Sequence, residues 1–229
     1  ELSIGEFHDK IRLENFDPGI DAYKDTQKQE ALFRYISTNA NFLGVYTRLL
    51  EEIVIPHLDH QLDDVLNDED ETNETQTFWC QFPPTLRIQP GPSTRYGRPH
   101  NDAEYGHQIG EVNFWLPLTD YSETQTALWV ESEPGLGDFH PLDCKVGSMT
   151  AFHGTLCKHH AAANPTTFTR ASLDFRVGVG KYFDSDWVLG GTKSDHGRIP
   201  IQGRPRDRGI VEAKKAATDT GPQAEDIGN

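Results

Sequence analysis

The amino-acid sequence predicts a mainly β protein with a helical N-terminal part. Short runs rich in β-branched and aromatic residues recur between turn residues, at 78–82, 85–89, 111–118, 127–131, 148–152 and 170–179. Such regular spacing of short strands is typical of a sandwich or barrel. The last run alternates strictly between apolar residues, beginning at Ala171, and polar ones, beginning at Arg170. One face of this strand should therefore be buried, and the other should be exposed to solvent or line a functional site.

The helical part is predicted from one apolar stripe. Between residues 31 and 55, apolar side chains recur at steps of three and four residues, which places them on one face of a helix that packs on the sheet. We expect this helix to stop at Pro56. Residues 59–74 contain eight acidic residues and no Lys or Arg. Their like charges should repel one another, so we expect this stretch to form a solvated loop.

The chain of 229 residues has the size of one β-rich domain. We therefore predict a single domain, 1–229. Its parts are a helical N-terminal part (1–58), an acidic loop (59–75), a β core (76–191) and a polar C-terminal tail (192–229), where the strand pattern gives way to Gly, Pro and charge.

The charge and composition of the chain limit the functions that it can have. The formal net charge of −15 would repel nucleic acids and anionic membrane surfaces at long range. No run approaches the roughly 20 apolar residues that span a bilayer, and no leader pattern opens the chain. The three cysteines are irregularly spaced without a CxxC pair, which argues against disulfides and thiolate zinc sites. We expect a cytoplasmic protein that binds a small molecule, and the pattern makes no prediction of its oligomeric state.

One constellation suggests redox chemistry at a metal. His100 and Asp102 form a His-x-Asp pattern, in which two ligands at a strand or its end point to one side. His159 follows after a strand-rich stretch, and Arg170 opens the next strand. Two His and one carboxylate leave three positions of a ferrous ion open, enough for a bidentate oxoacid and dioxygen. The planar fork of an arginine suits the far carboxylate of that oxoacid.

The stretch 87–179 resembles the Fe(II)/2-oxoglutarate-dependent oxygenases, in particular phytanoyl-CoA-hydroxylase-like and streptomycin-biosynthesis-type members. The likeness is carried by four pieces in order: His100-Asn101-Asp102, residues 113–120 (NFWLPLTD), residues 127–132 (ALWVES) and residues 159–176. The resemblance implies a double-stranded β-helix, the jelly-roll or cupin-like core, with the N-terminal helical part as a buttress on its outer face.

The resemblance also implies the site. In this family an Asn stands five positions, and an Arg eleven positions, after the distal His, and Asn164 and Arg170 have those offsets from His159. His160 is the alternative distal ligand. The implied reaction consumes Fe(II)-bound dioxygen and 2-oxoglutarate, releases succinate and CO2, and usually hydroxylates a substrate. Family members that halogenate lack the metal carboxylate, so Asp102 argues against halogenation.

Other residues are candidates for binding. Asn113 and Arg87 are expected to contact the co-substrate, and His107 and Tyr105 the substrate. Arg176 shares a strand face with Arg170, so it could bind the substrate or the oxoacid, or form an ion pair with Asp174 or another acidic neighbour at the rim.

The stretch 81–101 contains Arg87, Arg95 and Arg98 and no acid, which suggests a positive mouth for a polar or anionic metabolite. Two alternatives stay open: a cupin-like metal enzyme that does not use 2-oxoglutarate, and a non-catalytic β-barrel binding module.

Overall fold

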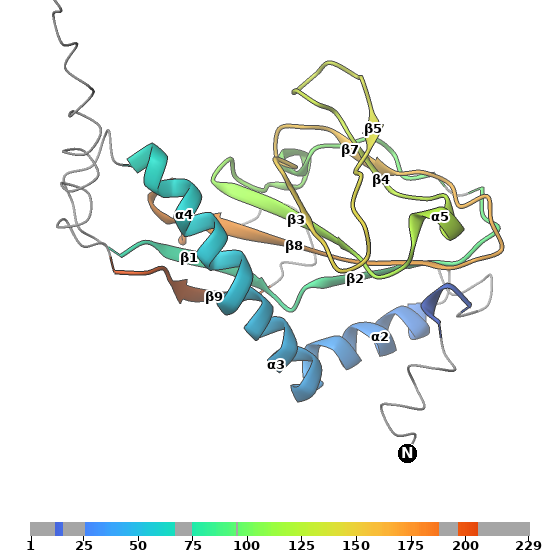
Figure 1. Ribbon diagram of the computed structural model, residues 1–229, viewed down its shortest axis with the longest axis horizontal. Coiled ribbons are helices and arrows are strands. Elements are labelled where there is room, and N and C mark those ends of the chain that lie inside the picture. Colours follow the sequence, from blue (N-terminus) through green and yellow to red (C-terminus); the bar gives the residue numbers. More distant parts are fainter. Residues whose placement is uncertain (1–11, 16–25, 67–74, 95, 188–196, 206–229) are drawn as a thin grey trace, which may run out of the picture.

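Antiparallel strands form two sheets, with helices on one side (Figure 1). The computed structural model describes residues 12–15, 26–66, 75–94, 96–187 and 197–205. The six-stranded sheet has the order β6-β3-β8-β1-β9, and β2 also pairs with β8. Its strands are β1 (Thr77–Phe82), β2 (Thr85–Gln89), β3 (Glu111–Pro117), β6 (Thr150–Phe152), β8 (Arg170–Val179) and β9 (Gly197–Gln202).

Strand β8 is the centre of the large sheet, because it pairs with β1, β2 and β3. The register places Arg170 opposite Gln89 of β2, and Arg176 opposite Asn113 of β3. The predicted alternation of β8 is confirmed: Phe175 and Val177 lie in the apolar core, whereas Arg170 and Arg176 line a cavity.

The smaller sheet faces the other side of the large one (Figure 1). It has the order β5-β4-β7, formed by β4 (Leu128–Val130), β5 (His140–Pro141) and β7 (His159–Ala161). Ser93 and His100 form antiparallel bridges to Asn164 and His159, so parts of the chain before η4 lie along β7 and its continuation. Gly97 permits this approach, because a Cβ there would lie 3.1 Å from the Ala161 nitrogen.

The N-terminal helices cover the face of the large sheet that turns away from the small one. They are α2 (Thr26–Thr38), α3 (Ala40–Leu49), a π-helical turn (Leu50–Val54) and α4 (Ile55–Leu66). Tyr46 and Leu50 pack against Phe78 and Phe175, and the Tyr46 hydroxyl donates to the Gln81 carbonyl oxygen at 2.9 Å. The predicted helical buttress is confirmed.

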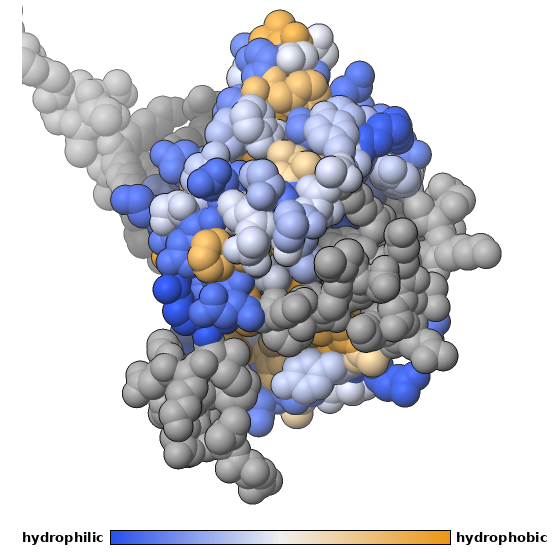
Figure 2. All heavy atoms as spheres, turned by 90° about the vertical axis from the view of Figure 1, so that its right-hand side faces the viewer, coloured by the Kyte–Doolittle hydropathy of each residue, from blue (hydrophilic) through white to orange (hydrophobic). Residues whose placement is uncertain are grey.

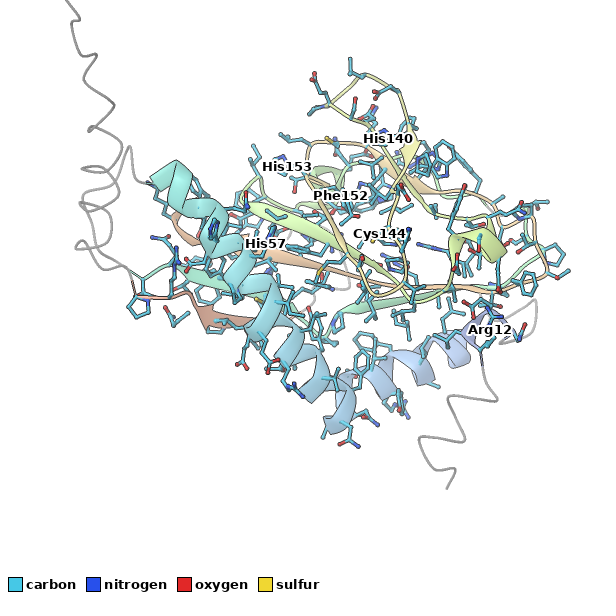
Figure 3. All side chains as sticks on the ribbon, viewed as in Figure 1. Arg12, His57, His140, Cys144, Phe152 and His153 are labelled. Atoms are coloured by element: carbon cyan, nitrogen blue, oxygen red, sulfur yellow. The ribbon has the colours of Figure 1, made fainter. Side chains whose placement is uncertain are left out.

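A second apolar cluster lies between the two sheets. Trp115 of β3 packs there with Ala127 and Cys144, beside Phe152 of β6. Figure 3 shows Phe152 and Cys144 on the small-sheet side and His57 on α4. Short helices lie in the connections: Leu13–Asn15, Asp102–Tyr105 (η4), Tyr121–Thr124 (α5) and Gly180–Tyr182. Helices and small sheet thus bury opposite faces of the large sheet.

Two boundaries differ from the prediction. Pro56 does not stop the helix: α4 follows directly on the π-helical turn Leu50–Val54, a local change of helix geometry at which the missing N–H is accommodated, and α4 continues to Leu66. The predicted acidic loop therefore begins as helix, and residues 67–74 lie outside the described residues.

The segment predicted as a polar tail contributes strand β9, which pairs along the whole of β1. Its Pro200 argues against a strand in sequence but is tolerated on an edge strand. The buried Asp59 of α4 accepts from the Arg204 backbone N–H at 2.9 Å, which fixes the end of this strand. Residues 188–196 and 206–229 lie outside the described residues.

Within the described ranges, no helix combines the length and apolarity that crossing a membrane requires. Figure 2 shows the side of the molecule that carries α5, which is mostly hydrophilic with small separate hydrophobic patches. One of these patches lies at the tip of the loop between β4 and β5, where Leu136 is exposed.

The buried Glu131 organises the same loop. Its carboxylate accepts from the backbone N–H groups of Gly135 (3.3 Å), Gly137 (3.0 Å) and Lys158 (2.8 Å). Burial alone would raise the pKa of Glu131, but these three donors bring the pKa below its ordinary value. Because Lys158 immediately precedes His159, Glu131 also fixes the start of β7.

Replacing Glu131 with Ala is expected to lower the free energy of unfolding by about 3 kcal/mol at pH 7, since three N–H groups lose a charged acceptor. Urea unfolding measures the change, and Glu133→Ala, an exposed neighbour, is the control. The lowered pKa stabilises the fold only while the carboxylate is ionised. The difference from wild type should therefore shrink as the pH falls below 4.5, the ordinary pKa of Glu131. A difference independent of pH would contradict this explanation.

Candidate metal centre

The side chains of His100, Asp102 and His159 converge between the two sheets. One potential ligand atom of each lies within 4.8 Å of the other two, and His159 Nε2 is 3.5 Å from Asp102 Oδ1. The two histidines are joined by reciprocal backbone hydrogen bonds, from His100 N to His159 O (3.2 Å) and from His159 N to His100 O (2.8 Å). Two segments distant in sequence are thus fixed side by side.

Asp102 is positioned by a helix start rather than by a strand. It is the first residue of η4, where Asn101 and Glu104 form a reciprocal capping box. Its backbone N–H donates to the Gly154 carbonyl oxygen at 2.8 Å. The His-x-Asp pattern therefore falls at the end of an extended segment, one of the two placements that the sequence allowed.

Backbone carbonyls set the tautomer of both histidines. His100 Nδ1 is 2.8 Å from the Arg98 oxygen, and His159 Nδ1 is 3.2 Å from the Cys157 oxygen. A carbonyl only accepts, so each Nδ1 carries a proton and each Nε2 is the ring nitrogen left to bind a metal. Burial lowers the pKa of His159, which favours the neutral, metal-binding form.

Hydrogen bonds fix one of the two oxygens of the Asp102 carboxylate. Its Oδ2 accepts from Asn113 Nδ2 at 2.7 Å and from Arg176 Nε at 2.8 Å, so Oδ1 is the oxygen that faces His159. Burial alone would raise the pKa of Asp102, but the charge of Arg176 and its hydrogen bond, with His159 and Asn113, lower the pKa to about 2. Gly154 makes room for this arrangement, since a Cβ there would lie 2.6 Å from the Asn113 amide.

These features fit a divalent metal ion. Two neutral imidazole nitrogens and one ionised carboxylate oxygen form the donor set that suits ferrous iron with open positions. The partners that fix each donor, namely two carbonyls, an amide and a guanidinium, are what orients the ligands of a metal site. His100, Asp102 and His159 are therefore the residues that would hold iron.

All nine site residues expected from the sequence line one cavity of about 400 Å³. They are His100, Asp102, His159, Arg170, Asn113, Arg87, Arg176, His107 and Tyr105. The fold brings them together, and their individual roles stay predictions. Tyr105 packs edge-on against His100, with ring centroids 5.1 Å apart.

Arg170 is buried in the wall of this cavity. Its guanidinium donates to Ser172 Oγ at 3.0 Å and to Gln89 Oε1 at 3.4 Å, and it lies 5.8 Å from the centre of the Trp115 ring. Asn164, at the offset that supported His159, is fully buried and donates to the Gln89 carbonyl oxygen at 3.0 Å. Asn164 thus supports the turn before Arg170 rather than the cavity.

Three other arginines near the cavity form ion pairs with acidic residues. Arg176 pairs with Asp102 rather than with Asp174. Asp174 instead pairs with Arg87 at 2.9 Å, and Arg98 pairs with Glu104 at 2.7 Å. The predicted positive mouth is therefore partly neutralised, because acids that are absent from the stretch 81–101 come from other segments. Arg95 lies outside the described residues.

His160 is not part of the cluster of possible metal ligands. Its ring lies among aromatic side chains, 4.7 Å from Tyr96 and 5.1 Å from Phe139 between ring centroids. His153 bonds to the Ile109 carbonyl oxygen at 2.9 Å, and His57 and His140 lie apart from the site (Figure 3). Within the described ranges, this geometry favours His159 over His160 as the distal ligand.

Buried polar atoms without a hydrogen-bond partner among the described residues occur in the cavity lining, for example Asn113 Oδ1, Trp115 Nε1 and His160 Nδ1. Buried polar atoms are normally satisfied, and unsatisfied ones in a cavity wall indicate that a polar ligand completes them. The sequence could place Trp115 on the face of Asn113, but gave no sign that its indole N–H would need a partner.

The fold and the site define a protein of antiparallel β-sheets with a two-histidine, one-carboxylate cluster between them. No protein-family model matches the chain. Over 105 residues, 46% of this chain, the sequence is 33% identical to the streptomycin biosynthesis protein StrG of Streptomyces griseus. The expected resemblance to a streptomycin-biosynthesis-type protein is thereby confirmed. The match covers 49% of that relative, so the chain spans about half of its length.

Two solved structures are similar in part. The non-haem monooxygenase ThoJ in its apo form has a TM-score of 0.45 at 17% identity, over 82% of this chain and 79% of ThoJ. The non-haem alpha-ketoglutarate-dependent epimerase SnoN from nogalamycin biosynthesis has a TM-score of 0.39 at 16% identity, over 80% of this chain and 72% of SnoN. Both likenesses are distant.

Replacing Arg176 with Gln is expected to weaken metal binding by roughly 10- to 100-fold, the usual effect of losing a residue that orients a ligand. Without the guanidinium the pKa of Asp102 should rise, so protons compete with the metal. Calorimetric titration with Ni(II) or Co(II) at constant pH measures the affinity. Arg48→Gln, which removes an exposed arginine on α3, is the matched control. Unchanged affinity in the Arg176 variant would contradict the positioning role.

The choice of distal ligand can be tested directly. Stoichiometric metal binding should be lost in His159→Ala and retained in His160→Ala, because only the former removes a member of the cluster. The same metal titration, together with circular dichroism to verify folding, measures both variants. Loss of binding in His160→Ala alone would reverse the assignment.

Proposed function

We propose that this protein is an Fe(II)- and 2-oxoglutarate-dependent dioxygenase with a double-stranded β-helix core, hydroxylating a small polar or anionic metabolite. The observation that carries this proposal is the convergence of His100, Asp102 and His159 in one cavity with the buried Arg170. The similarity of part of the chain to StrG adds support for a role in the biosynthesis of a small metabolite.

The residues around the cluster suit an oxoacid. Arg170 can donate two parallel hydrogen bonds to the far carboxylate, and Ser172 and Gln89 hold its guanidinium in place. The indole N–H of Trp115, beside Arg170, is a further donor without a partner among the described residues. Burial of these donors strengthens their attraction for an anion, because little water competes.

The remaining cavity would hold the substrate next to the metal ligands. A ferrous ion held by His100, Asp102 and His159 would supply the activation of dioxygen. In the overall reaction, 2-oxoglutarate would lose CO2, one oxygen atom would enter succinate, and the other would enter the substrate as a hydroxyl group. The protein's own contribution is to orient both molecules and exclude water. Phe152 and Leu128 supply apolar walls for this, and Arg87 lies on the same cavity.

The two alternatives make different use of Arg170. A cupin-like metal enzyme that does not use 2-oxoglutarate needs the metal ligands but no buried arginine beside them. A non-catalytic β-barrel binding module needs neither. The burial of Arg170 in the same cavity as the three ligands therefore favours the oxygenase.

With Fe(II), ascorbate and 2-oxoglutarate, the protein is expected to form succinate slowly even without a substrate. Asp102→Ala and His159→Ala should abolish succinate formation. Arg170→Gln should retain metal binding but raise the 2-oxoglutarate concentration for half-maximal rate by roughly 100-fold, since a buried bidentate contact is lost. Mass spectrometry quantifies succinate. Metal binding without any 2-oxoglutarate-dependent succinate would favour the cupin-like alternative, and no metal binding would favour the binding module.

A further inference from the structure

We infer that the Arg87–Asp174 ion pair is the anchor for an anionic group of the substrate, which takes the place of Asp174 on the Arg87 guanidinium. The inference rests on the proposed function, because it assigns a role in the same cavity. It narrows the substrate to molecules that carry a carboxylate or a phosphate. It also assigns Arg87 to the substrate, whereas the sequence led us to expect a contact with the co-substrate.

The three arginines of the cavity wall differ in how firmly the protein holds them. Arg176 is bound to Asp102 in an ion pair that is almost completely buried. Arg170 is buried as well and is the proposed anchor of the oxoacid. The side chain of Arg87, in contrast, is 54% exposed, and that of its partner Asp174 is 22% exposed. Arg87 is therefore the cavity arginine that a ligand entering from solvent can reach.

The Arg87–Asp174 pair has the geometry of an oxyanion site. Arg87 Nε lies 2.9 Å from Asp174 Oδ1, and Nη2 lies 3.2 Å from Oδ2, so the contact is bidentate. A guanidinium holds a carboxylate or a phosphate of a ligand in the same way. Because water reaches both side chains, the pair contributes little to stability, and the exchange of one anion for another costs little. Asp174 thus occupies a place that already suits the oxygen atoms of a ligand.

The pair lies between the two other arginines of strand β8. Asp174 is four residues beyond Arg170 and two residues before Arg176, and all three side chains line the cavity. Alternate residues of a strand share one face, so the order along β8 is also the order along the cavity wall. An anionic group bound at Arg87 would therefore lie beside both the proposed oxoacid anchor and the residue that orients Asp102.

The charges of the cavity favour an anionic ligand. Three guanidinium groups, those of Arg87, Arg170 and Arg176, line it against the two carboxylates of Asp102 and Asp174, which leaves an excess of one positive charge. The charges of a divalent metal ion and of 2-oxoglutarate, a dianion, cancel each other, so the loaded cavity keeps this excess. A positive cavity attracts anions and repels cations. An amino group that bound to Asp174 instead would meet that repulsion.

Binding is measured with methyl phosphate as the probe, by phosphorus-31 NMR of protein loaded with Zn(II) and 2-oxoglutarate. Trimethyl phosphate, which carries no charge, is the control ligand and should not bind. Arg87→Gln should raise the dissociation constant of methyl phosphate at least about tenfold, because a bidentate, charge-assisted contact is lost. Arg48→Gln removes the arginine of another exposed bidentate pair, with Glu52 on the helical side, and should bind the probe as the wild type does.

The substitution Asp174→Asn separates competition within the pair from a general change of charge. Without the competing carboxylate, Arg87 should bind methyl phosphate about two- to fivefold more tightly. This gain should vanish in the double variant Arg87→Gln/Asp174→Asn, because both residues act on one site. A long-range effect of the lost negative charge would persist in the double variant.

Several results would overturn the inference: equal responses to the two phosphates, no binding of methyl phosphate, undiminished binding by Arg87→Gln, an equal loss in Arg48→Gln, or no gain in Asp174→Asn. A gain that persists in the double variant would do the same. An anion that only coordinated Zn(II) would give undiminished binding by Arg87→Gln.

Binding of Zn(II) and 2-oxoglutarate is recorded on the same samples, which also verifies folding. In Arg87→Gln the dissociation constant of 2-oxoglutarate should stay within about twofold of the wild type, since Arg170 remains. A rise of roughly tenfold would assign Arg87 to the co-substrate and overturn the inference alone. If the wild type binds neither Zn(II) nor 2-oxoglutarate, the proposed function fails, and the inference fails with it.

Discussion

The reciprocal backbone hydrogen bonds between His100 and His159 hold the centre of this molecule together. They join the extended segment before η4 to strand β7, and so bring two imidazoles to within 4.7 Å between ring centroids. Asp102 is two residues further along the same segment. If this bridge shifted by one residue, the side chains would turn to the opposite face and the cluster would not form. The register of one short pairing therefore determines whether the site exists.

The second constraint is electrostatic. Asp102 is almost completely buried, and such a carboxylate is costly unless charge and hydrogen bonds compensate it. Arg176 and Asn113 do so on one oxygen and leave the other directed to the histidines. Because β8 and β3 place Arg176 and Asn113 opposite each other, the large sheet positions this pair as directly as it positions the core. The core and the site share one scaffold, with apolar residues of β8 on one face and cavity residues on the other.

Several buried acids connect separate segments of the chain. Glu131 collects three backbone N–H groups before β7, and Glu111 joins His107 to β9 through Arg198. Asp59 holds the end of β9 on α4. Each acid connects segments distant in sequence, and each is compensated by partners that no local pattern reveals. An acidic chain of net charge −15 thus uses part of its carboxylates as internal ties rather than as solvated surface.

The sequence by itself determined the strands with strong alternation, such as β8, and the residue types of the site, because side-chain period and motif offsets are local properties. It missed β5 and β7, which are too short to show a period, and β9, whose Pro200 obscures it. It extended the acidic loop back to residue 59, because Pro56 predicts the end of a helix, although the helix continues through a π-helical turn into α4. Only the tertiary structure decided that Arg176 pairs with Asp102, that His159 rather than His160 joins the cluster, and that Glu111 supports His107. Those contacts depend on strand register across the fold, which the order of residues along one segment does not specify.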